Sequence, residues 1–158
     1  MDVTLEPMTA DRFVQWREQE IIEFAKDKVK ASVWPEDKAM KASAAEIASL
    51  LPDGPDTAGH DLFVAIADGT EVGQLWLFTD PEALAPETFI YEIAIDEQHQ
   101  GKGLGRSLLA AAETWCAERG VKVVRLNVFA FNMTAISLYE SSGYTVTNLN
   151  MMKRVGLS

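Results

Sequence analysis

Hydrophobic residues follow helical spacing in the first third of the chain and then change to the spacing of β-strands. A short strand-like segment at residues 3–6 precedes an apolar helical face on residues 11–30. A second helix is predicted to begin near Pro35, because proline suits the first turn of a helix. The residues expected to face the core from this second helix are Met40, Ala44, Ile47 and Leu51.

The middle of the chain predicts a β-hairpin and a third strand. Residues 62–67 and 71–78 are rich in branched and aromatic side chains, and Asp68-Gly69 between them is typical of a two-residue hairpin turn. A loop with two prolines follows, and residues 88–95 again have a strand-like composition. The sheet is therefore expected to form mainly from residues 62–95.

Helices and strands alternate in the last third of the chain. An apolar face predicts a helix from Leu104 that ends at Gly120, a suitable C-cap. A strand at 121–128, a helix at 132–142 and an extended stretch at 144–155 follow. This order favours an α/β fold of mixed α+β character on a single sheet, and 158 residues without a linker or repeat fit one domain, 1–158.

The charge balance narrows the range of partners. Fourteen Lys and Arg residues against 24 Asp and Glu residues give a net charge of −10, which argues against nucleic acid as a partner. The excess of acid serves solubility, or steers cationic partners towards the protein. No apolar run is long enough to span a membrane, and a single cysteine without a signal-like N-terminus leads us to expect a cytoplasmic protein.

Three glycines at alternate positions stand between a predicted strand and a predicted helix. Gly101, Gly103 and Gly105 allow close backbone approach to a phosphate, and the N-terminus of the following helix favours negative charge. Lys102 and Arg106 add positive charge to this loop. The spacing fits neither a dinucleotide fingerprint nor a nucleotide P-loop, and a merely flexible turn is the weaker alternative.

Two segments resemble the GNAT superfamily of N-acetyltransferases. Residues 100–105 are similar to its Q/R-x-x-G-x-G/A motif, and residues 132–144 to its N-x-x-A-x-x-L-Y-x-x-x-G-F/Y segment. Val128-Phe129 and residues 50–54 resemble a poorly characterised bacterial subgroup of this family. The resemblance implies a mixed, mostly antiparallel sheet, splayed at its central strand and flanked by about four helices, with acetyl-CoA as the donor. The residues it places at the cofactor are Ile93, Ala94, Ile95, Gln100, Gly101, Lys102, Gly103, Leu104, Gly105, Arg106 and Asn132.

Two further residues are candidates for acid–base chemistry. The family position makes Tyr139 the candidate general acid, although a core tyrosine would fit the same helix. Glu92 is the candidate general base, because a carboxylate within a strand is unusual, and strand alternation predicts that it faces away from Tyr91 and Ile93. Glu87, Asp96, a water chain and a purely structural role for Glu92 are the alternatives.

The sequence thus predicts direct transfer of an acetyl group to a primary amine in a ternary complex. The acceptor is expected to be a small-molecule amine or a peptide amine such as a protein N-terminus or lysine, and a homodimer is left open. A non-catalytic acyl-CoA-binding regulatory module is the alternative from another class. His60 and His99 lack metal-ligand spacing, so we expect no metal, and Cys116 lies on an apolar helix face typical of the core.

Overall fold

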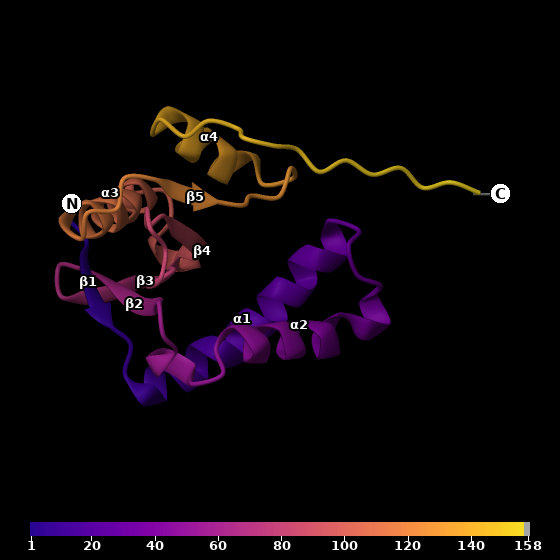
Figure 1. Ribbon diagram of the computed structural model, residues 1–158, viewed down its shortest axis with the longest axis horizontal. Helices are drawn as coiled ribbons and strands as arrows, with labels where there is room; N and C mark the ends of the chain where they lie inside the picture. Colours follow the sequence, from indigo (N-terminus) through magenta and orange to yellow (C-terminus); the bar gives the residue numbers. More distant parts are fainter. Residues whose placement is uncertain (157–158) are drawn as a thin grey trace.

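A five-stranded sheet in the order β1-β2-β3-β4-β5 organises the protein. The computed structural model describes residues 1–156 (Figure 1). The strands are β1 (Thr4–Pro7), β2 (His60–Ala67), β3 (Thr70–Thr79), β4 (Thr88–Ile95) and β5 (Val124–Leu126). The helices are α1 (Ala10–Lys30), α2 (Glu36–Leu50), α3 (Leu104–Glu118) and α4 (Met133–Ser141), with short 3-10 turns at Gly54–Asp56 and Glu97–His99.

Strands β1 to β4 form an antiparallel meander, and β5 joins its edge parallel to β4. The turn between β2 and β3 has positive φ at both Asp68 (49°) and Gly69 (74°), as a two-residue hairpin turn of type I′ requires. The predicted hairpin and the mixed, mostly antiparallel sheet with four helices are therefore confirmed.

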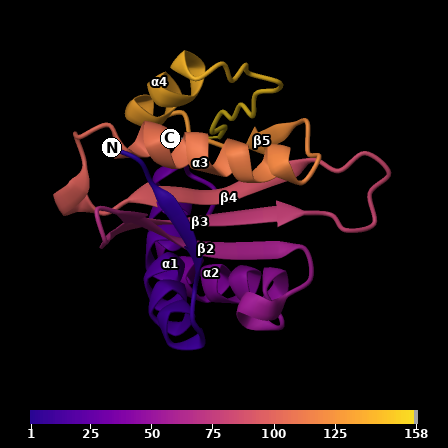
Figure 2. The ribbon, with the colours of Figure 1, turned by 90° about the vertical axis from the view of Figure 1, so that its left-hand side faces the viewer.

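The helices cover the two faces of the sheet, with α1 and α2 on one side and α3 and α4 on the other (Figure 2). Phe13 and Trp16 of α1 pack with Trp76 on the first face, and Leu75 and Leu108 belong to the core on the second. Thr9 begins α1, since its hydroxyl accepts a hydrogen bond from the Arg12 N–H over 3.1 Å. No helix within residues 1–156 is long and apolar enough to cross a membrane.

The buried face of α2 differs from the predicted one. Ala39, Ser43 and Ile47 face the core, whereas Met40 is 51% exposed. The Ser43 hydroxyl donates to the Ile21 carbonyl over 2.7 Å, so small side chains bring α2 close to α1. The prediction that Met40 faces the core is wrong, because close helix packing favours small residues over bulk at this contact.

The C-terminal part contains less regular structure than the sequence predicts. The strand expected at 121–128 shrinks to Val124–Leu126, which pair with Thr88–Ile90. Residues 145–156 are extended, as expected, but pair with no strand in the described part of the chain. They project away from the sheet beyond α4 (Figure 1).

Candidate active site

Strand β4 has a neighbour along only part of one side. It pairs with β3 over its whole length, but with β5 only from Thr88 to Ile90. Within residues 1–156, no strand pairs with residues 91–95 on the side facing β5, which is the splaying expected at the central strand. The side chains of Ile93 and Ile95 pack against the core under α3, so only their backbone groups are available in this opening.

The glycine loop continues directly from this open stretch. The Gln100 side chain donates from Nε2 to the Ile95 carbonyl over 2.9 Å and ties the loop to the end of β4. Gly101 and Gly103 both have φ of 80°, a left-handed conformation that side chains rarely adopt. Gly105 is instead the second residue of α3, where a Cβ would lie 3.5 Å from Leu138 Cδ2, an ordinary contact.

The loop ends at the uncapped N-terminus of α3. Gly103 is the N-cap residue and offers no side-chain acceptor, so the first N–H groups of α3 point into the loop, where the helix dipole favours an anion. Leu104 is buried in the core, which leaves its backbone as the part that faces the loop.

The two basic residues of the loop have different surroundings. Lys102 is exposed on the loop. Arg106 donates hydrogen bonds to the hydroxyl oxygens of Ser141 (2.8 Å) and Ser142 (3.2 Å) at the end of α4. The guanidinium therefore joins α3 to α4 rather than projecting freely into the loop.

Helix α4 brings Tyr139 to the same side of the sheet. Asn132 caps this helix, since its side-chain oxygen accepts from the Ala135 N–H over 3.2 Å. The Tyr139 ring is 9% exposed within the core, and burial raises the pKa of its hydroxyl. No hydrogen bond joins this hydroxyl to a protein group in residues 1–156, in contrast to Tyr144, which donates to Glu113 Oε2 over 2.7 Å. Burial and helix position thus fit a core tyrosine, while the unpaired hydroxyl leaves a donor available.

A β-bulge at Tyr91 places the side chains of Tyr91 and Glu92 on the same face of the sheet. Trp76 of β3 pairs with Glu92 and Leu77 with Ile90, so Tyr91 is the extra residue of β4. Tyr91 stacks on the Trp76 ring, and Glu92 contacts Trp16, so both side chains lie on the α1–α2 face. The prediction that Glu92 and Tyr91 lie on opposite faces of the sheet is therefore wrong, because a bulge interrupts strand alternation. The prediction that Glu92 and Ile93 lie on opposite faces is confirmed, since Ile93 packs against the core on the α3 side.

A second carboxyl group, which the sequence analysis did not single out, lies beside Glu92. The Trp16 indole N–H donates to Glu92 Oε1 over 2.8 Å, and Glu20 follows one helical turn after Trp16. Burial, the adjacent Glu92 carboxyl and the nearby Asp27 and Glu23 raise the pKa of Glu20 far above its ordinary range. One oxygen of Glu20, Oε2, is buried without a hydrogen-bond partner among residues 1–156. Helical spacing from Phe13 and Trp16 was a signal that could have identified it.

The two alternative base candidates differ in whether their carboxylates have a partner. Arg125 binds Glu87 over 2.6 Å and, through that hydrogen bond, holds the pKa of Glu87 below its ordinary value. For Asp96 the contact in this turn is made by the backbone, whose carbonyl accepts from the His99 N–H, and not by the carboxylate. Cys116 is 1% exposed, which confirms its place in the core.

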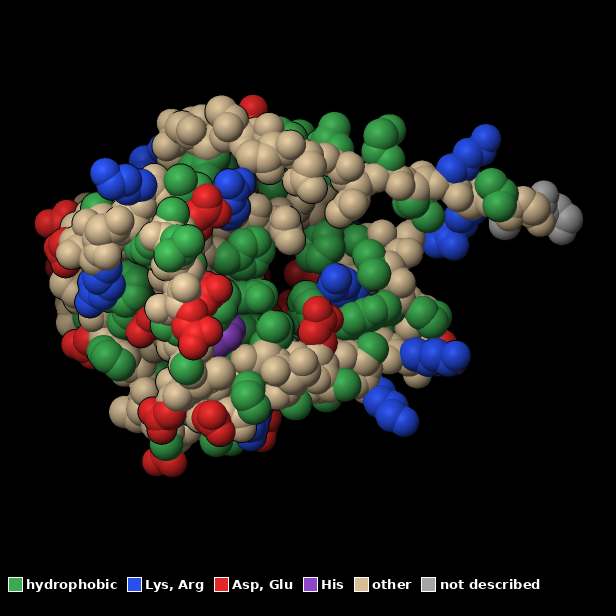
Figure 3. Space-filling model, viewed as in Figure 1, with side chains coloured by type: hydrophobic (Ala, Val, Ile, Leu, Met, Phe, Trp, Pro, Cys, Tyr) green, Lys and Arg blue, Asp and Glu red, His purple; other side chains and the backbone are tan. Residues whose placement is uncertain are grey.

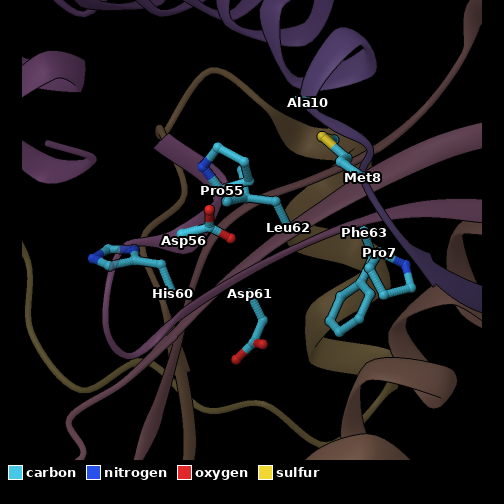
Figure 4. Close-up of a pocket in the computed structure, with 9 residues that line it drawn as sticks. All are labelled: Pro7, Met8, Ala10, Pro55, Asp56, His60, Asp61, Leu62 and Phe63. Carbon is cyan, nitrogen blue, oxygen red and sulfur yellow. The ribbon is translucent and has the colours of Figure 1, made fainter. Parts of the chain in front are cut away.

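Two open hollows in the described part of the chain lie away from the glycine loop and from residues 91–95 of β4. One of about 240 Å³ lies between β2, the start of α1 and the turn at 54–56 (Figure 4). Another of about 270 Å³ borders the loop before β4 and the ion pair of Glu87 with Arg125. Neither space is lined by Tyr139, Glu92 or a residue predicted to bind the cofactor, although the alternative base Glu87 lines the second. Residues 1–156 contain no group of three or more His, Cys, Asp or Glu residues placed to hold a metal ion.

The sequence and the fold match those of known acetyltransferases. The sequence model described as the Acetyltransferase (GNAT) family matches residues 27–144. The chain belongs to this family. The GNAT match includes the open part of β4, the glycine loop and α4.

Similar proteins extend the GNAT match to nearly the whole chain. The N-acetyltransferase YdgE of Bacillus subtilis, itself uncharacterized, is 35% identical over 156 residues and covers 98% of this chain and 99% of its own. The crystal structure of YycN from Bacillus subtilis, 33% identical, superposes with a TM-score of 0.94 over 97% of this chain and 98% of its own. The ribosomal protein bS18-alanine N-acetyltransferase of Escherichia coli is 37% identical over 75 residues, covering 48% and 51% of the two chains. The protein is therefore an acetyltransferase enzyme of the GNAT type.

The local structure fits the acyl donor that the GNAT family uses, acetyl-CoA. Two left-handed glycines and the uncapped start of α3 form a cradle suited to a pyrophosphate. The unpaired backbone of residues 93–95 leads into that cradle. The donor set is thus mainly backbone N–H groups, which suits a phosphate-bearing, extended ligand.

Proposed function

We propose that this enzyme transfers an acetyl group from acetyl-CoA directly to a primary amine within a ternary complex. The observation that carries the proposal is the double role of β4. Its open backbone leads into the glycine loop, while its Glu92 side chain lies on the opposite face beside Trp16 and Glu20. Strand β4 thereby connects the proposed donor site with a pair of carboxyl groups, one of which can accept a proton from an amine.

The donor site is formed mainly by backbone groups. The N–H groups of Ile93 and Ile95, which point away from β3 on either side of Ala94, orient the pantetheine arm, and those of residues 101–106 bind the pyrophosphate. Lys102 adds a positive charge, Leu104 contributes its backbone, and Asn132 contacts the arm from the start of α4 while capping that helix. When bound, acetyl-CoA supplies the activated acetyl group.

Glu92 accepts the proton that the amine must lose. Trp16 fixes Oε1 through its 2.8 Å hydrogen bond, so the carboxyl is held in one orientation. Glu20 keeps its own proton because burial and the neighbouring acids raise its pKa. Glu20 therefore keeps a proton of its own, and Glu92 is the carboxyl that we propose as the acceptor of the amine proton.

Tyr139 supplies a proton to the departing sulfur. Burial raises the pKa of its hydroxyl, so the protonated form prevails at neutral pH, as a general acid requires. The absence of a hydrogen-bond partner for this hydroxyl within residues 1–156 leaves its proton available.

The burial of the one cysteine supports direct transfer. Cys116 lies in the core, and burial raises the pKa of its thiol, which makes it unsuited to carry an acyl group. The acetyl group then passes straight from the donor to the amine.

We infer that the acceptor is a small cationic amine. The hollow between the α1–α2 lobe and the opposite layer has acidic, hydrophobic and basic side chains at its edge (Figure 3). Glu23 and Asp27 follow Glu20 along α1, and their negative charges help to raise the pKa of Glu20. The Lys30 amine lies 4.3 Å from the Phe131 ring centre, so the end of α1 meets the loop before α4 and narrows the approach for a folded protein.

A peptide amine is the second candidate, because the similar Escherichia coli enzyme is named for acetylating an alanine of a ribosomal protein. The test measures thiol release from acetyl-CoA with a panel of small diamines and of peptides with free N-termini, and identifies each product by mass. Turnover with diamines and not with peptides supports the proposal. Turnover with peptides alone would assign the second candidate, and hydrolysis without any acetylated amine would reject direct transfer.

A further inference from the structure

Aromatic side chains continue along the α1–α2 face of the sheet from Glu92 towards the loop that joins β3 to β4. Tyr91 stacks on the Trp76 ring, with 4.6 Å between the ring centres, and meets the Phe89 ring at a steep angle with 4.8 Å between centres. Phe78 pairs with Phe89 across the two strands, and its ring centre lies 6.4 Å from that of Tyr91. The rings therefore form a continuous apolar path that starts beside Glu92.

The far part of this aromatic path lies outside the core that the helices cover. Trp76 is buried in the core beneath α1 and α2, whereas Phe78 and Phe89 are not part of that core and are only partly buried. Tyr91 is 38% exposed. Neighbouring aromatic rings that remain accessible in this way offer a contact surface to the apolar part of a ligand.

The aromatic path ends at the hollow of about 270 Å³ that borders the loop before β4. The apolar lining of this hollow is formed by Phe78, Ala83, Ala85 and Phe89. Arg125 and Glu87 at its border pair with each other over 2.6 Å, so their charges cancel. Asp80 is the remaining charged residue of the lining, and within residues 1–156 it forms no ion pair. The hollow thus offers apolar walls and one negative charge.

The position of Asp80 relative to Glu92 is set by the register of the sheet. Trp76 pairs with Glu92, and Asp80 follows Trp76 by four residues, so the two positions are about 13 Å apart along the direction of β3. The loop after β3 lies at the end of the sheet opposite the turn that leads into α3 (Figure 2). A ligand that extends from Glu92 towards Asp80 therefore points away from the glycine loop and leaves room for the donor.

We propose that the aromatic path and the hollow bind the tail of the acceptor, and that this acceptor is a long aliphatic diamine. The inference rests on the proposed transfer to an amine at Glu92. One amine of the diamine meets Glu92, the methylene chain lies along Tyr91 and Phe89, and the other, protonated amine reaches Asp80. Aromatic rings suit such a chain in two ways, because they make apolar contact with methylene groups and attract a nearby ammonium group.

The test measures dissociation constants of amines for the full-length chain by isothermal titration in the presence of coenzyme A, which has no acetyl group to transfer. The probes are putrescine, octamethylenediamine and octylamine. We expect octamethylenediamine to bind about tenfold more tightly than putrescine, whose chain is too short to reach Asp80. It should bind about threefold more tightly than octylamine, which lacks the second ammonium group.

Three variants separate the charge of the hollow from its space. Asp80→Asn should remove the advantage of octamethylenediamine over octylamine, while its side-chain oxygen can still accept from the Glu82 N–H and keep the turn. Glu82→Gln is the matched control, because Glu82 is exposed on the same loop without lining the hollow, and it should leave this advantage unchanged. Ala85→Trp fills the hollow and should reduce the affinity for octamethylenediamine to that for putrescine.

Other results would overturn the proposal. These are equal affinity for putrescine and octamethylenediamine, no binding of either, octylamine binding as tightly as the long diamine, or equal effects of Asp80→Asn and Glu82→Gln. Binding of the long diamine that depends on Asp80, without any acetylated product, would reject the proposed transfer and support the binding site. Acetylation of amines without a preference for chain length would reject the binding site and support the transfer.

Discussion

The indole N–H of Trp16 donates to Glu92 Oε1 over 2.8 Å and joins α1 to β4 across 76 positions of sequence. Trp16 is 3% exposed, so the hydrogen bond is held by a side chain that is itself fixed by packing. Glu20, on the next turn of α1, adds a second carboxyl to the same place. The acid–base chemistry proposed for this enzyme depends on that junction of helix and strand.

Substitution Glu92→Gln should lower kcat about 100-fold, because the amide cannot accept the amine proton. The loss should be greatest at low pH, where little free amine is present, and kcat measured from about pH 6 to about pH 9 checks this. Glu87→Gln is the control, because Arg125 already holds that carboxylate, and it should retain the wild-type rate. Equal loss at every pH would assign the base to another group.

Substitution Tyr139→Phe should lower kcat by about 100-fold while the affinity for acetyl-CoA stays near that of the wild type, since only the acidic proton is removed. Steady-state kinetics and a binding titration separate the two effects. Tyr144→Phe is the matched control: it breaks the hydrogen bond to Glu113 and should lower the free energy of unfolding by about 1 kcal/mol without a comparable loss of kcat. An unchanged rate in Tyr139→Phe would contradict its role as the acid.

Substitution Glu20→Gln should stabilise the protein at neutral and higher pH. The folded-state pKa of Glu20 is raised above its ordinary value of 4.5, so its contribution to stability is complete below pH 4.5 and is lost as the pH rises towards the folded pKa. Glutamine removes this loss and should gain at least about 1 kcal/mol at pH 8, with little change at pH 4. Thermal unfolding of both proteins across this range measures it, and parallel curves would show that Glu20 is not buried with a raised pKa.

Substitutions Gly103→Ala and Gly105→Ala should have opposite effects on stability. Gly103 has φ of 80°, where a Cβ costs about 1 kcal/mol even though nothing lies within 4 Å of it. Gly105 is helical, so alanine there should be neutral or stabilise by up to about 1 kcal/mol. Thermal unfolding compares the two, and isothermal titration with acetyl-CoA should show weaker binding for Gly103→Ala. Equal stability of both variants would contradict a conformational role for Gly103.

Much of the fold, and the local structure of the proposed donor site, could be predicted because the signals are local. The hairpin turn at Asp68-Gly69, the glycine loop and the cap at Asn132 each depend on the conformation of a few neighbouring residues. The face of the sheet on which the side chains of Tyr91 and Glu92 lie could not be predicted in the same way. A bulge depends on how β4 registers with β3, and alternation along one strand does not reveal it.

By itself, the sequence determined the order of the elements, the glycine loop, the position of Tyr139 on a helix and the resemblance that identified the family. These follow from backbone preferences and periodicity within single segments. Only the tertiary structure decided that Glu20 lies beside Glu92, that small residues rather than Met40 join α2 to α1, and that the C-terminal segment leaves its own sheet edge open. Packing between distant segments settles such contacts, because burial and pairing depend on which surfaces meet in space.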